Sequence, residues 1–306
     1  MNFLLADNYF FMAFNVQTFK TRTLTAIVFA VIMLSGLFIN HWSFFILFSI
    51  IHFGCWIEYQ KLIGLIDPTY KQIKSSHKYG IILLGWCFMM YMSNSQYKLQ
   101  QSELRGIGWL FMIIISIILL ATEIVIKKDI AIKQIAYSLI GLIYISLSWG
   151  MMMNLRSGFE TTALKFSIDY GVIIPAGLIF SIWINDTMAY IVGSVFGKTP
   201  LSAISPKKTW EGTIGGAILC IIAIAWLSKI VPVASYYSMS TWMVIAAIAA
   251  VIGTIGDLIE SKLKRMANVK DSGNFMPGHG GFLDRFDSLL LATPFVWLYV
   301  HLLLNN

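Results

Sequence analysis

Residues 241–265 read TWMVIAAIAAVIGTIGDLIESKLKR, and this stretch decides the class of fold. It is apolar up to Gly256, and then carries Asp257, Glu260 and three basic residues. About 20 apolar helical residues are needed to cross the hydrocarbon core of a bilayer. The stretch therefore predicts a membrane-spanning helix whose charged end lies at one face of the membrane.

The whole chain has the composition of a membrane protein. Of its 306 residues, 58% are hydrophobic and only 12% are charged, and the mean hydropathy is +0.74. Soluble domains carry about 25% charged residues. Runs that meet the length for a span, or nearly do, occur at 23–40, 42–57, 79–92, 107–126, 135–153, 170–184 with a continuation to 196, 212–231, 241–257 and 286–304. We predict an all-α polytopic membrane protein with about nine transmembrane helices.

The basic residues alternate between loops and predict an orientation. If every run crosses the membrane, 17 of the 22 Lys and Arg residues fall on one side and 5 on the other. Cytoplasmic loops are enriched in Lys and Arg, so the N-terminus is expected inside and the C-terminus outside. The net charge of +7 then reflects loops that face anionic lipid, and no nucleic-acid partner is expected.

No segment resembles a separate soluble domain, and the chain shows no internal repeat. We divide it into residues 1–170, with about five spans, and residues 171–306, a C-terminal catalytic region whose active site faces the cytoplasm. Residues 1–19 lack the basic start of a cleavable signal, so the first helix is expected to be retained.

Several residues are interpreted as structural. The three cysteines are expected to be small buried apolar residues: Cys55, Cys87 and Cys220. Gly212 and Gly216 have a GxxxG spacing, which is interpreted as ordinary helix packing. Glu58 and Glu123 lie near helix ends, and pairing with Lys61 or Lys127 is sufficient to explain them.

Two polar segments precede the charged stretch. Asn185-Asp186-Thr187 interrupts an apolar run, where a carboxylate is costly and usually functional, although an Asp at a helix end at the membrane interface is the alternative. Lys207 and Lys208 precede Trp210 at a helix start, where cations and free N–H groups suit phosphate oxygens, although lysines of a cytoplasmic loop explain them equally well. The segment 193–199 (GSVFGKT) is one residue too short between its glycines for a phosphate-binding P-loop and follows a membrane helix, so a P-loop is rejected.

The densest polar cluster runs from Asp257 to Asp287. Two sets of side chains at helical spacing each share a face, one at the end of the eighth span and one at the start of the ninth: Asp257, Ser261 and Lys264; Asp284, Asp287 and Ser288. A Gly-rich turn at 277–281 (PGHGG) lies between them. Two helix ends with carboxylates, joined by a basic Gly-rich loop, can hold a divalent metal and phosphates.

These residues resemble the signature of the phosphatidate cytidylyltransferase (CDP-diacylglycerol synthase) family. The resemblance lies in 261–265 (SKLKR), Lys270-Asp271 and 277–287 (PGHGGFLDRFD), and is strong over about 180–290. Asn185-Asp186-Thr187 and 205–212 (SPKKTWEG) are similar to other blocks of the family, in the same order. Met276 departs from the family's usual Leu, Ile or Phe, an exchange of one apolar residue for another.

The resemblance implies the reaction of CTP with phosphatidate to give CDP-diacylglycerol and pyrophosphate. It implies Mg²⁺ on Asp257 and Asp284, and K⁺ is an open choice for a second metal. The implied catalytic residues are Asp257, Asp284, Lys264, Arg265 and His279. The implied substrate-binding residues are Lys207, Lys208, Asp186, Ser261, Lys270, Asp271, Arg285 and Asp287. His279 would orient a phosphate or carry a proton, although a structural turn residue is an equal alternative.

The implied partners are CTP, phosphatidate and membrane lipids, with a homodimer left open, and the expected location is the bacterial inner membrane. Two other classes remain as alternatives. A transporter would place its acidic groups near the membrane midplane between repeated halves, whereas here they gather in the C-terminal third. A related enzyme that uses another lipid has no distinguishing sequence signature, because acyl-chain pockets have none.

Overall fold

The computed structural model describes residues 16–126, 132–157, 170–275 and 280–304, and most of them lie in helices. The α-helices are α1 (Val16–Phe38), α2 (His41–Ile66), α3 (Pro68–Lys71), α4 (Ser75–Tyr91), α5 (Leu104–Ile126), α6 (Ile132–Gly141), α7 (Leu147–Ser157), α8 (Ile173–Phe196), α9 (Trp210–Ile230), α10 (Met239–Met266) and α11 (Leu283–Tyr299). Shorter elements are the strands β1 (Lys98–Leu99) and β2 (Ser102–Glu103), the π-helices η1 (Leu142–Ser146) and η4 (Val300–Leu304), and the 3₁₀ helices η2 (Tyr170–Val172) and η3 (Pro232–Tyr236). Every apolar run of the sequence coincides with a helix, so the all-α class is confirmed.

Within the described residues, six helical segments are long and apolar enough to cross a membrane: His41–Ile66, Leu104–Thr122, Ile132–Arg156, Ile173–Phe196, Trp210–Ile230 and Met239–Met266. The third of these joins α6, η1 and α7 into one span. The chain is therefore a polytopic membrane protein. The count of nine crossings stays a prediction, because α4 and α11 have 17 residues each and the apolar part of α1 is also short.

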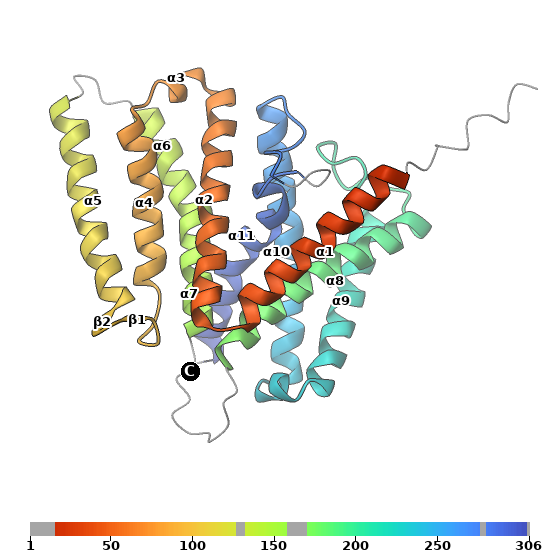
Figure 1. Cartoon of the computed structure of the whole chain (residues 1–306). Coiled ribbons are helices and arrows are strands. Elements are labelled where there is room, and N and C mark those ends of the chain that lie inside the picture. Colours follow the sequence, from red (N-terminus) through yellow and green to blue (C-terminus); the bar gives the residue numbers. More distant parts are fainter. Residues whose placement is uncertain (1–15, 127–131, 158–169, 276–279, 305–306) are drawn as a thin grey trace, which may run out of the picture.

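The long polar segments lie at one end of the molecule. Figure 1 shows α3, the α8–α9 loop and the α10–α11 loop at the upper end, and the β1–β2 hairpin and η3 at the lower end. The alternation of basic loops along the sequence predicts this grouping. Helices α1 and α8 are strongly tilted relative to α2 and α4, and α10 and α11 run through the middle of the molecule.

Two helices continue through polar residues beyond the ends of their apolar runs. Helix α8 continues through Asn185-Asp186-Thr187 to Phe196, and α10 continues nine residues beyond Asp257 to Met266. In α10 the polar residues repeat at helical spacing, and Glu260 pairs with Lys264 one turn later. Asp257 therefore lies inside a rigid helix, more than two turns before its end.

The glycines of α9 pack against α8 in the same chain. A Cβ on Gly216 would lie 2.7 Å from the Ala189 backbone, and one on Gly212 would lie 2.9 Å from the Cα of Gly193. The interpretation of this GxxxG pair as ordinary packing is confirmed. Cys55, Cys87 and Cys220 are buried free thiols, as expected.

Helix α11 is fixed against α7, which positions its first turn. The rings of Trp149 and Phe286 meet edge to face, with centroids 5.8 Å apart. The Ser148 hydroxyl donates to the Leu290 carbonyl at 2.6 Å. These contacts hold the start of α11 beside the charged half of α10.

Candidate active site

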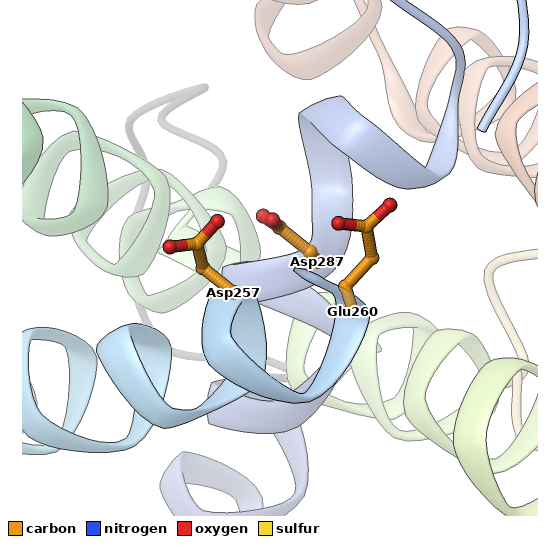
Figure 2. A group of neighbouring side chains, drawn as sticks. All are labelled: Asp257, Glu260 and Asp287. Carbon is orange, nitrogen blue, oxygen red and sulfur yellow. The ribbon is translucent and has the colours of Figure 1, made fainter. Parts of the chain in front are cut away.

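Three carboxylates meet where α10 and α11 pack together. Figure 2 shows Asp257 and Glu260 on α10 and Asp287 on α11, with their side chains directed toward a common region. One oxygen from each lies within 4.8 Å of the others. Glu260 is fully buried and Asp287 is 7% exposed. Hard divalent cations take such oxygen ligands.

Glycines on α10 bring the two helices close enough for this meeting. A Cβ on Gly256 would lie 2.6 Å from the Asp287 carbonyl oxygen, and one on Gly253 would lie 3.3 Å from the Ser288 Cβ. Larger side chains at these positions would separate the backbones. The separation of the carboxylates is therefore fixed by contact between helices rather than by a loop.

Lys264 is the cation between two of the acidic groups. Its ammonium lies 2.6 Å from Glu260 Oε2 and 2.6 Å from Asp284 Oδ1. Its side chain is 12% exposed, and those of Glu260 and Asp284 are 0% and 8% exposed. One buried ammonium thus neutralises charge on both helices.

A second lysine reaches the site from the α8–α9 loop. Lys208 forms an ion pair with Asp257. The loop turns back on itself, because the Leu201 N–H donates to the Lys208 carbonyl at 2.7 Å and the Lys208 N–H donates to the Ser205 carbonyl at 3.1 Å. Thr209 then caps α9 by accepting from the Gly212 N–H at 3.1 Å. Lys208 thus lies beside Asp257, and its role in substrate binding stays a prediction.

Asp284 lies beside the three-carboxylate group and has four donor groups around it, one of which it shares with Glu58. Its Oδ2 accepts from the Ser272 N–H at 2.9 Å, the Ser272 hydroxyl at 2.8 Å and the Gly281 N–H at 2.7 Å. Its Oδ1 accepts from Lys264 at 2.6 Å. In the described residues, Asp257 is therefore grouped with Glu260 and Asp287, and Asp284 anchors the α10–α11 loop.

A carboxylate from α2 completes this network. Glu58 is 7% exposed, and its Oε1 accepts from the Phe282 N–H at 2.9 Å. Its Oε2 accepts from the Leu283 N–H at 2.9 Å and from the Ser272 hydroxyl at 2.7 Å. The interpretation of Glu58 as a helix-end residue paired with a lysine is wrong. The residues bonded to Glu58 lie more than 200 positions later in the chain, so no spacing pattern in the sequence connects them with it. Only the position of a carboxylate within an apolar run indicated a role.

Helix α8 contributes a carboxylate near Lys208 and Asp257. Asp186 is exposed in the isolated chain and interacts electrostatically with Lys208 and Asp257. Asn185 is 4% exposed, and its Oδ1 has no hydrogen-bond partner in the described part of the chain. Asp186 thus lies near the charged group, and its functional role stays a prediction.

The other predicted site residues lie around this centre. Ser261 is buried on α10. His279 lies outside the described residues, as does the side chain of Glu123. Exposed side chains at the same end of the molecule are Lys207, Arg265, Lys270, Asp271 and Arg285. These five exposed side chains are accessible to a substrate from solution, and their roles stay predictions.

Comparisons with known proteins give consistent results. A family model described as the cytidylyltransferase family matches residues 20–303. A phosphatidate cytidylyltransferase of Bacillus subtilis is 31% identical over 287 residues, which cover 92% of this chain and 98% of the relative. Proteins of the same name are similar in Staphylococcus saprophyticus, at 30% identity over 285 residues, and in Staphylococcus aureus, at 32% over 292 residues; each match covers 90% of this chain and 96% of the relative.

Replacing Lys264 with Met tests the buried ion pairs. We expect the variant to lose about 3 kcal/mol or more of unfolding free energy, because removal of one partner leaves buried charges uncompensated. The matched control is Lys262→Met, an exposed lysine on the same helix that should melt like the wild type. The measurement is the unfolding of purified protein in detergent. Equal stability of the two variants would show that Lys264 does not compensate Glu260 and Asp284.

Proposed function

Because the chain belongs to the cytidylyltransferase family, we propose that it is a phosphatidate cytidylyltransferase, the activity named for its relatives over nearly their full length. The reaction joins CTP and phosphatidate to give CDP-diacylglycerol and pyrophosphate. The observation that carries the proposal is the match over 92% of this chain, combined with a carboxylate and lysine site inside the matched region.

The chemistry needs alignment and charge control rather than a protein nucleophile. A phosphate oxygen of phosphatidate attacks the α-phosphorus of CTP, and the bond from that phosphorus to the bridging oxygen of the β-phosphate breaks. Pyrophosphate leaves with the electron pair. Lys208 supplies an ammonium beside Asp257 for phosphate oxygens, and Lys264 keeps Glu260 and Asp284 in place.

The residues present fit a divalent cation, and we propose Mg²⁺. Asp257, Glu260 and Asp287 offer oxygen ligands within 4.8 Å of one another, and the fully buried Oε1 of Glu260 has no hydrogen-bond partner in the part of the chain described. Both substrates are polyanions and would be repelled by this carboxylate group without a cation. Bound Mg²⁺ would neutralise charge on the phosphates and on the departing pyrophosphate. K⁺ as a second metal stays a prediction.

We propose Asp287, rather than Asp284, as the α11 ligand that acts with Asp257. Asp284 already accepts hydrogen bonds from Lys264 and from the Ser272 and Gly281 N–H groups, and it shares the Ser272 hydroxyl with Glu58, whereas Asp287 accepts one from the Ser288 N–H and lies in the three-carboxylate group. The pair Asp257 and Asp284, which the family resemblance implies, is the alternative.

We further propose nine crossings with the N-terminus inside, and an active site that faces the cytoplasm of a bacterial cell membrane. The uneven loop charges support this orientation, and the charged end of α10 lies at the same end of the molecule as the other basic loops. The division into residues 1–170 and 171–306 also stays a proposal. A homodimer stays a prediction, and the GxxxG face of α9 is already occupied by α8.

The activity itself is tested with purified protein in detergent. With phosphatidate, labelled CTP and Mg²⁺, we expect CDP-diacylglycerol identified by mass and one pyrophosphate per lipid product. Excess EDTA should abolish turnover, and added Mg²⁺ should restore it. A product formed only from another lipid acceptor would reassign the substrate, and full turnover in EDTA would remove the metal from the proposal.

The choice of metal ligand is tested by two variants. Asp287→Asn should lower turnover by a factor of about 100 or more, because loss of metal-based stabilisation is worth several kcal/mol. It should also remove the rise in melting temperature caused by Mg²⁺. Asp284→Asn should lower activity through the loop but keep the Mg²⁺-dependent rise. The reverse pattern would establish the Asp257 and Asp284 pair.

The orientation is tested with reporters fused after the last residue. A reporter active only outside the cytoplasm should be active at the C-terminus, and one active only in the cytoplasm should be inactive there. The opposite result would contradict the model of nine crossings with the N-terminus inside.

A further inference from the structure

The start of α11 is not capped by a side chain of the residue that precedes the helix. The residue before it, Phe282, has helical backbone angles and makes no side-chain cap. The first N–H groups of any helix lack partners within the helix, and leaving them unpaired in a buried position is costly. The N–H groups of Phe282 and Leu283 both donate to Glu58 of α2, at 2.9 Å each.

The surroundings of Glu58 are shaped for a carboxylate. A Cβ on Gly281 or on Gly273 would overlap the Glu58 carboxylate, so both positions need the small residue that they have. The start of α11 also favours negative charge, because its first N–H groups point out of the helix and carry partial positive charge. Glu58 therefore sits in a cradle of amides and glycines that belongs to the family signature region.

Ser272 connects Glu58 with Asp284. Its hydroxyl lies 2.7 Å from Glu58 Oε2 and 2.8 Å from Asp284 Oδ2. A hydroxyl has one hydrogen, so it donates to one carboxylate at a time, while the Ser272 N–H holds Asp284 at 2.9 Å. Ser272 therefore links the position of Glu58 to that of Asp284 through one residue of the loop.

We propose that Glu58 is a positioning residue for the active site, acting through the first turn of α11. By fixing the N–H groups of Phe282 and Leu283, it sets the position of α11 along its own axis relative to α10. Asp287 lies one helical turn after Leu283 on α11, so its distance from Asp257 depends on that axial position. This role rests on the proposed function, and it extends the site to a helix outside the signature region.

Glu58→Gln is the sharpest test, because glutamine has nearly the same shape. It has one acceptor oxygen where Glu58 uses two, and its NH₂ would face an N–H of α11 or the Ser272 hydroxyl. We expect kcat to fall about tenfold or more, and the Mg²⁺ concentration for half-maximal activity to rise by a similar factor. Those factors correspond to the loss of hydrogen bonds to a charged group. The KM for CTP should change less than kcat.

The matched control is Glu103→Gln, the same exchange at an exposed strand residue at the far end of the molecule. It should keep wild-type kcat and Mg²⁺ dependence. Ser272→Ala is the second variant, which cuts the link between Glu58 and Asp284 but leaves the two amide bonds. It should move the same two quantities by a smaller factor, and the double variant should show less than the product of the single effects.

The outcomes separate the possible roles. A folded Glu58→Gln protein with wild-type kcat and Mg²⁺ dependence would overturn the proposal, whatever its melting temperature. If that variant does not fold, Ser272→Ala decides, and wild-type Mg²⁺ dependence there would overturn it. If the wild type makes no CDP-diacylglycerol, the proposed function fails, but the Mg²⁺-induced rise in melting temperature still tests Glu58. That rise should need about tenfold more Mg²⁺ in Glu58→Gln than in Glu103→Gln.

Discussion

Buried carboxylates at the ends of apolar helices are the constraint on which the rest of this structure depends. Glu58, Glu260 and Asp287 are each less than 10% exposed, and an uncompensated charge in such a place costs several kcal/mol. The chain compensates them with ammonium groups and backbone amides. The loops that bring those donors must fold around the carboxylates, so the charges determine the loop structure as well as the chemistry.

The compensation also connects parts of the chain that are distant in sequence. Lys208 comes from the α8–α9 loop, and the Ser272 hydroxyl comes from the α10–α11 loop. Glu58 comes from the second helix of the chain and bonds to residues more than 200 positions later. A region without recognisable motifs thus contributes directly to the order of the region that has them.

The sequence predicted the helices well because crossing a bilayer imposes length and apolarity, which are visible in any single run. Helical spacing also placed Asp257 and Lys264 on one helix face and Asp284 on the face of the next helix, and all of them lie at the junction of α10 and α11. The partner of Glu58 was not predictable, since contact between distant helices follows from packing and not from spacing. For the same reason, spacing did not distinguish Asp284, which anchors the loop, from Asp287, which meets Asp257.

The two signs of charge are carried by different kinds of structure. The carboxylates stand on α10 and α11, whose backbones meet at Gly253 and Gly256, and such close packing holds their separation to a narrow range. Lys208 lies on a loop closed by backbone hydrogen bonds, and its ammonium is carried on a flexible four-carbon side chain. A site that must hold a small cation needs ligands fixed within fractions of an ångström, while phosphates of changing position are better met by a mobile ammonium. This division would place rigidity at the proposed cation site and adjustability at the proposed nucleotide site. Glu58 belongs to the rigid part because its oxygens accept from backbone N–H groups at the start of α11.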